Sequence, residues 1–152
     1  MEKTDKRLYL LTLIYLAWLL MILAVFGYTP GPDTDGYIAI ARKCLAEGEP
    51  YPCTANIEGT PFLWNIGSIN LIEASLALTG SITPLLVVFC FMKAATALFT
   101  AKTARILIGD RTAVATMLIY MLYPNNWGQS TTLLSELPMV FFATMAVWAS
   151  VR

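Results

Sequence analysis

The chain has 152 residues, of which 57% are hydrophobic and 13% are charged, and its mean hydropathy is +0.64. This composition lies outside the range of ordinary soluble domains and predicts an integral membrane protein. A formal net charge of zero and the absence of a basic cluster argue against nucleic acid as a partner. Because the sequence contains no histidine, imidazole acid/base chemistry and histidine metal ligands are excluded, and carboxylates are the expected reactive groups.

The first apolar segment runs from Leu8 to Tyr28, and about 20 such residues are needed to cross a bilayer as a helix. Lys3, Lys6 and Arg7 precede it, as basic residues precede the core of a secretory signal. The run is longer than such a core and has no convincing cleavage site with small residues, so we expect a retained signal-anchor.

Three further apolar segments are expected to cross or enter the bilayer, at residues 82–100, 112–123 and 131–150. We expect the first of these to extend to Ile108 and the second to continue beyond Pro124. The sequence therefore predicts an all-α, polytopic membrane protein with about four transmembrane helices in a single domain, residues 1–152. The first span lies within residues 1–28, a large loop covers residues 29–81, and three spans occupy residues 82–152.

Basic residues predict how the spans are oriented. Within the loop 29–81 only Arg42 and Lys43 are basic, whereas seven basic residues flank the other ends of the predicted spans: Lys3, Lys6, Arg7, Lys102, Arg105, Arg111 and Arg152. By the positive-inside rule, both termini are cytoplasmic and the loop is external, in a periplasm or a lumen.

The external loop is expected to contain two juxtamembrane helices. Apolar or small residues recur at helical spacing at Tyr37, Ala41, Cys44, Leu45 and Gly48, which predicts an amphipathic helix suited to the headgroup region and ended by Gly48 and Pro50. A second, more apolar helical stretch is expected from Pro61 to Leu78. Cys44 and Cys53 share this loop, and either a disulfide or two free thiols fits their spacing.

Asp33 and Asp35 are the first candidates for chemistry, because they follow the first span within a few residues. In one interpretation they only cap the helix that follows, with Gly-Pro and Gly36 as turn residues. In the other, one carboxylate accepts a proton from an acceptor hydroxyl or amine, or the Asp-x-Asp pair binds a divalent cation that bridges phosphate oxygens.

Two charged residues lie within or beside the later spans. Glu136 opens the last span, where a carboxylate is either a simple interfacial residue favoured by the helix dipole or part of a cavity. Lys93 lies inside the second span and is expected to snorkel or to pair with a carboxylate. Cys90 is expected to be an ordinary buried residue. Aromatic residues at the outer boundary are expected to form an interfacial belt, and the candidates are Trp64, Tyr123 and Trp127.

The order of these features resembles the GT-C class of membrane glycosyltransferases, above all the group of protein O-mannosyltransferases and the lipid A aminoarabinose transferase. In that group one span is followed by an external acidic motif ahead of a tyrosine, here Asp33-Thr34-Asp35-Gly36-Tyr37. The later motifs also have counterparts in this chain: Ile40-Ala41-Arg42, Leu45-Ala46-Glu47-Gly48, Pro50-Tyr51, Pro61-Phe62-Leu63-Trp64, Leu78-Thr79-Gly80, Arg105 to Arg111, Pro124 and Glu136.

The resemblance implies a transferase that takes a sugar from a polyprenyl-phosphate donor on the external face. Asp33 would be the catalytic loop aspartate and Asp35 a second carboxylate or a metal ligand, with the use of a divalent ion left open. Tyr37, Arg42 and Glu136 would bind substrate. GT-C enzymes usually have about a dozen spans, so this chain corresponds to the N-terminal module alone or to one chain of a split enzyme.

Two other interpretations remain open at this stage. The chain is alternatively a non-catalytic membrane subunit or assembly factor that packs against a larger complex. A small transporter is the third possibility, although the sequence shows no internal repeat. Membrane lipid is an expected partner, and the split-enzyme and subunit interpretations both predict a further membrane protein chain.

Overall fold

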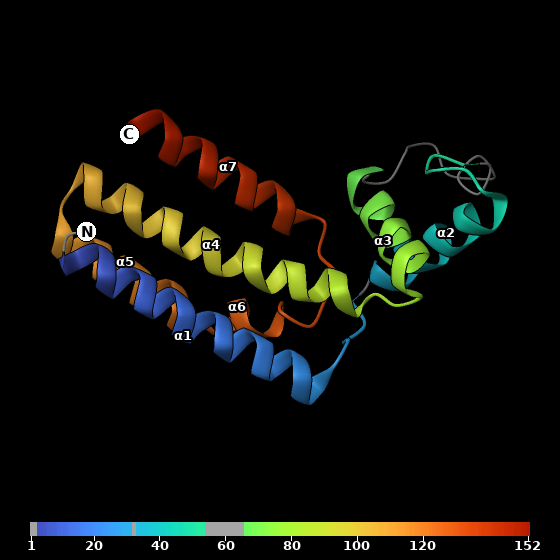
Figure 1. Cartoon of the computed structure of the whole chain (residues 1–152), viewed down its shortest axis with the longest axis horizontal. Coiled ribbons are helices and arrows are strands. Elements are labelled where there is room, and N and C mark those ends of the chain that lie inside the picture. The colour runs from blue at the N-terminus through green and yellow to red at the C-terminus, as the bar shows by residue number, and fades with distance from the viewer. Residues whose placement is uncertain (1–2, 32, 54–65) are drawn as a thin grey trace.

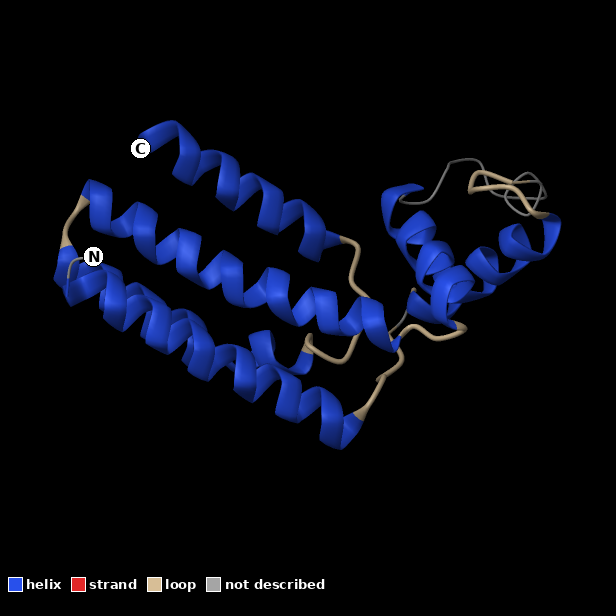
Figure 2. Ribbon diagram, viewed as in Figure 1, coloured by secondary structure: helices blue, strands red, loops and turns tan. Residues whose placement is uncertain are grey.

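The computed structural model describes residues 3–31, 33–53 and 66–152, and every regular element in these ranges is an α-helix. Most of the helices form an elongated bundle, and two form a smaller lobe at one end of it (Figure 1). The expected all-α fold class is therefore confirmed, as the ribbon of Figure 2 also shows. The helices are α1 (Lys3–Phe26), α2 (Thr34–Glu47), α3 (Ile66–Thr79), α4 (Thr83–Leu107), α5 (Asp110–Leu122), α6 (Pro124–Gly128) and α7 (Glu136–Val151).

Helix α4 is the centre of the bundle and packs against α1, α5 and α7. Small residues on α4 are fully buried, and they let the backbones of the neighbouring helices approach closely: Ala94, Ala97 and Ala101. On α1 the buried side chains recur every four or seven residues, so a single stripe of that helix faces the bundle: Leu8, Tyr15, Leu19 and Leu23.

Two helices, α1 and α4, are long and apolar enough to cross a membrane. With 24 and 25 residues they extend about 36–38 Å, more than the roughly 30 Å hydrocarbon core. With 13 and 16 residues, α5 and α7 extend only about 20 and 24 Å. Large apolar side chains remain exposed along the bundle, including Leu13, Val25, Phe91, Ile119 and Phe142, which supports membrane association.

The structure confirms one predicted segment boundary and corrects two. Helix α4 reaches Leu107, as expected, but α5 ends at Leu122 and does not continue past Pro124. Tyr123 is extended, and Pro124, which has no N–H to donate, begins the separate helix α6. The last helix begins at Glu136 rather than at residue 131. Before it, the hydroxyls of Ser130 and Thr131 donate to backbone carbonyls, a local bonding pattern that competes with helix formation.

The lobe is built from α2 and α3, which pack on each other. The predicted amphipathic helix is present as α2, and its apolar face is covered inside the lobe, so this face is not available to lipid. Leu45 was expected on that face but is 37% exposed. Gly48 ends α2 with a φ of +73°, a conformation that glycine adopts without cost. The buried residues of the two helices are Thr34, Tyr37, Ile38, Ala41, Cys44, Ile69, Ile72 and Leu76.

Two links hold the segment after α2 onto the lobe. Cys44 and Cys53 form a disulfide, which decides between the two alternatives left by the sequence. The backbone N–H and carbonyl of Tyr51 are bound by the side-chain amide of Asn70 on α3, both at 2.9 Å. The described part of the second loop helix begins at Ile66, and the expected start at Pro61 and the belt residue Trp64 lie outside the described residues.

Candidate functional site

The acidic turn (Gly31, Asp33, Thr34 and Asp35) lies where the bundle meets the lobe (Figure 1). The turn is closed locally, because Thr34 Oγ1 accepts the backbone N–H of Gly31 at 2.6 Å. Asp33 occupies the N-cap position of α2, yet its side chain makes no capping hydrogen bond and is exposed. The capping interpretation therefore does not describe Asp33, whose carboxylate stays open to an incoming group.

Asp35 has a defined partner. The hydroxyl of Tyr28, just after α1, donates to Asp35 Oδ1 at 2.9 Å. Burial, more than any other cause, raises the pKa of Tyr28, so the phenol keeps its proton and acts as a donor to the carboxylate. Tyr28 thereby fixes the orientation of the Asp35 carboxylate.

The acidic turn does not form a metal site by itself. Residues two apart on a helix do not face each other, so the carboxylates of Asp33 and Asp35 point to different sides. Across the described ranges, no three His, Cys, Asp or Glu side chains come together in a way that could hold a metal ion. Within the described part of the chain, Asp33 and Asp35 therefore belong to no such group.

The acidic turn is held against the bundle through the segment that leads into α7. The backbone N–H of Thr29 donates to the carbonyl of Thr131 at 2.9 Å. A Cβ atom on Gly31 would lie 2.9 Å from Thr132 Cγ2 and 2.7 Å from Thr34 Oγ1. Glu136 follows four residues after Thr132, so the same segment positions the start of α7 and the acidic turn.

We expect Gly31→Ala to destabilise the protein by about 1–3 kcal/mol, because the new methyl group would push Thr34 and Thr132 apart and break the turn. Thermal unfolding in detergent, followed by circular dichroism, measures the loss. Gly67→Ala is the matched control, since nothing lies within 4 Å of a Cβ there. An equal melting temperature for the two variants would contradict the close contact.

A pocket of about 410 Å³, lined by both polar and apolar side chains, opens between α4, α5, α6 and α7. At its wall Lys93 is 3% exposed, and its Nζ donates to the carbonyl of Asn126 at 2.8 Å and to Gln129 Oε1 at 3.4 Å. The expectation that Lys93 snorkels is wrong, and its recorded partners are neutral oxygens rather than a carboxylate. Glu136 is exposed and lines the same pocket, together with Thr96, Tyr120, Leu134, Leu137 and Val140.

The remaining residues that the sequence analysis singled out lie partly in the lobe and partly in the bundle. Tyr37 is 9% exposed and lies in the core of the lobe. Arg42 is exposed seven residues after Asp35, which puts the two on the same side of α2 and about 10 Å apart along its axis. Tyr123 is 56% exposed, whereas Trp127 is partly buried and its indole packs edge-on against Trp18.

Several residues of the site were missed by sequence reasoning. Tyr28 fell within the first predicted span, and neither Asn126 nor Gln129 was predicted as a site residue. One signal could have found the last two: residues 125–132 form a polar run, Asn-Asn-Trp-Gly-Gln-Ser-Thr-Thr, between two apolar segments. Polar groups beside apolar spans are expected to bond each other or to line a cavity.

Fold and site together define an all-α protein with two helices able to cross a membrane and an acidic turn at one end of its bundle. No protein-family model matches the chain, and neither a curated protein nor a solved structure matches it.

Proposed function

We propose that this chain is the N-terminal module of a GT-C-type glycosyltransferase, or one chain of a split one, moving a sugar from a polyprenyl-phosphate donor to an acceptor. The proposal rests on one observation: the carboxylate of Asp33 is exposed and makes no hydrogen bond that caps α2. This carboxylate lies seven residues beyond the end of α1, near the expected membrane surface. A lipid-borne substrate would be presented at that level.

The proposal includes a topology of four crossings with cytoplasmic termini and an external lobe, in a periplasm or a lumen. The distribution of charge supports it, because the bundle end opposite the lobe carries Arg7, Lys102, Arg105, Arg111 and Arg152. In this topology α5 and α7 are short crossings. The loop that follows α6 completes the external side of the bundle between them.

In the proposed reaction, Asp33 removes the proton from an acceptor hydroxyl or amine as that group attacks the anomeric carbon of the sugar. The bond from that carbon to the phosphate oxygen breaks on the opposite face, and polyprenyl phosphate leaves, so the configuration inverts. The proton ends on Asp33. Asp35, held by Tyr28, assists or contributes a metal ligand, Arg42 binds phosphate, and Glu136 forms part of the outer cavity wall.

One observation favours the non-catalytic alternative. Arg42 and Lys43 are the only basic residues in segment 29–81, both are exposed on α2, and Lys93 is already bonded to Asn126 and Gln129. A donor phosphate generally requires Arg or Lys side chains. The split-enzyme proposal therefore requires basic residues from a partner chain, whereas a non-catalytic subunit requires none.

The test is isolation of the chain from its native membrane in mild detergent, followed by a transfer assay on the intact assembly. The probes are radiolabelled polyprenyl-phosphate-linked hexose and pentose with membrane extract as acceptor. Transfer by the assembly, lost when this chain is depleted, supports the proposal. A stable assembly that transfers neither sugar, or transfers equally well without this chain, would favour the subunit.

A further inference from the structure

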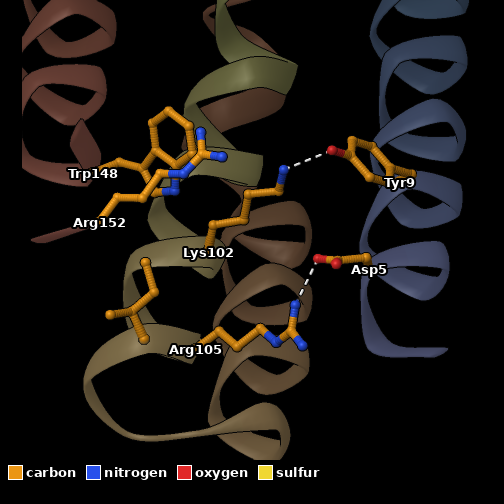
Figure 3. Close-up of a pocket in the computed structure, with 7 residues that line it drawn as sticks. Asp5, Tyr9, Lys102, Arg105, Trp148 and Arg152 are labelled. Carbon is orange, nitrogen blue, oxygen red and sulfur yellow. Dashed lines mark hydrogen bonds and ion pairs between the residues drawn. The ribbon is translucent and has the colours of Figure 1, made fainter. Parts of the chain in front are cut away.

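A second pocket, the basic-aromatic pocket, lies at the bundle end where both termini are found, opposite the lobe (Figures 1 and 3). Its volume is about 510 Å³, and α1, α4 and α7 contribute its walls. The proposed transferase chemistry uses none of its residues. They are Asp5, Tyr9, Lys102, Arg105, Ile106, Trp148 and Arg152.

Cations in this pocket exceed carboxylates, because Lys102, Arg105 and Arg152 face only Asp5 among its lining residues. Asp5 is already engaged by Arg105 Nη1 at 2.7 Å, and Arg105 Nε also binds Asp110 at 2.7 Å. The hydrogen bond from Arg105 lowers the pKa of Asp110, as expected for an ion pair. Arg105 thus pairs with two carboxylates, whereas Lys102 and Arg152 contact aromatic rings instead.

Aromatic rings hold these two cations in position. Lys102 Nζ donates to the hydroxyl of Tyr9 at 2.7 Å and lies 4.5 Å from the centroid of that ring. The guanidinium of Arg152 lies 5.1 Å from the centroid of Trp148 (Figure 3). An ammonium group has three donors, and the bond to Tyr9 uses one of them. Tyrosine and tryptophan beside lysine and arginine at a helix end are typical of the membrane interface.

We infer that the basic-aromatic pocket binds the phosphate headgroup of an anionic phospholipid in the leaflet opposite the lobe. The phosphate would sit between Lys102 and Arg152, and the acyl chains would lie along the exposed apolar side chains of α1 and α7. Those side chains include Leu10, Leu13, Phe142 and Val147. Basic pockets between membrane helices recognise anionic headgroups in this way. The inference rests on membrane association and does not require the transferase.

The test is native mass spectrometry of the purified chain in neutral detergent, titrated with phosphatidylglycerol or with phosphatidylcholine. Both lipids carry a phosphate, but only the first has a net charge. With two cations at the site, we expect phosphatidylglycerol to be retained on the order of ten times better. Equal retention of the two lipids by the unmodified chain would overturn the inference.

Two double variants test whether Lys102 and Arg152 cause the preference for phosphatidylglycerol. Lys102→Gln with Arg152→Gln is expected to remove it, whereas Lys43→Gln with Arg111→Gln makes the same charge change at two exposed residues outside the pocket and is expected to preserve it. A preference that survives the first pair, or falls equally with both, would contradict the pocket. If the first pair fails to fold by circular dichroism, Arg152→Gln alone is measured, since its side chain is exposed and a partial loss of preference is expected.

Free phosphate is the competing ligand. We expect millimolar inorganic phosphate to leave the retained phosphatidylglycerol in place, because the acyl chains add apolar contacts that the free ion lacks. Displacement of the lipid by inorganic phosphate would show that the pocket takes a soluble anion and would overturn the assignment to a phospholipid.

Discussion

Asp33→Asn is expected to reduce sugar transfer by the intact assembly by about 10²–10⁴-fold, the contribution typical of a general base. Asparagine keeps the size of the side chain but cannot take up the acceptor proton. Because Asp33 makes no capping hydrogen bond, the substitution should leave α2 intact. Initial rates with the labelled polyprenyl-phosphate donor measure the effect, and membrane insertion should be unchanged.

Two further variants make this result specific. Asp35→Asn is expected to reduce transfer less, since Asp35 acts beside the base and its hydrogen bond from Tyr28 can be kept by the amide oxygen. Glu49→Gln removes an exposed carboxylate of the same lobe and is expected to leave transfer unchanged. Full activity of Asp33→Asn would remove Asp33 from the mechanism.

Lys93→Glu is expected to destabilise the bundle by about 3–5 kcal/mol, the cost of a buried charge without a partner. The new carboxylate would face the carbonyl of Asn126 and Gln129 Oε1, which are both acceptors, in a pocket that Glu136 also lines. Lys93→Met removes the charge and leaves the carbonyl without its donor, so a smaller loss of about 1–3 kcal/mol is expected.

Thermal unfolding in neutral detergent measures both losses. Lys43→Glu is the matched control, because Lys43 is exposed on α2 and the same charge reversal there should change stability little. If Lys93→Glu were as stable as Lys43→Glu, this result would contradict the hydrogen bonds of Lys93 to Asn126 and Gln129.

Local signals in the sequence predicted much of the fold. The long apolar runs predicted α1 and α4, and helical spacing with a terminal glycine predicted α2 up to Gly48. These elements depend on residues within a few turns of each other, so pattern and length were sufficient. The two cysteines were left with two alternatives, because their spacing did not distinguish a disulfide from free thiols.

The candidate site was only partly predictable, since its contacts join distant segments. The acidic turn was identified from Asp33 and Asp35, but its attachment through Thr29 and Thr131 spans about a hundred residues. Lys93 bonds an oxygen 33 residues away, on a helix that exists because Pro124 interrupts the third apolar segment. The polar run at residues 125–132 marks this segment in the sequence but does not say which distant residue it bonds. The start of α7 was misplaced for a local reason, because the hydroxyls of Ser130 and Thr131 bond backbone carbonyls ahead of the helix.

Cysteine labelling at position 33 tests the central claim most directly. In Asp33→Cys, an impermeant maleimide is expected to react from outside intact cells, whereas Arg111→Cys, exposed near the opposite end of the bundle, should react only after permeabilisation. Cys44 and Cys53 are paired and Cys90 is buried, so background labelling should be low. Labelling of position 33 only from the cell interior would contradict an external carboxylate and the transferase built on it.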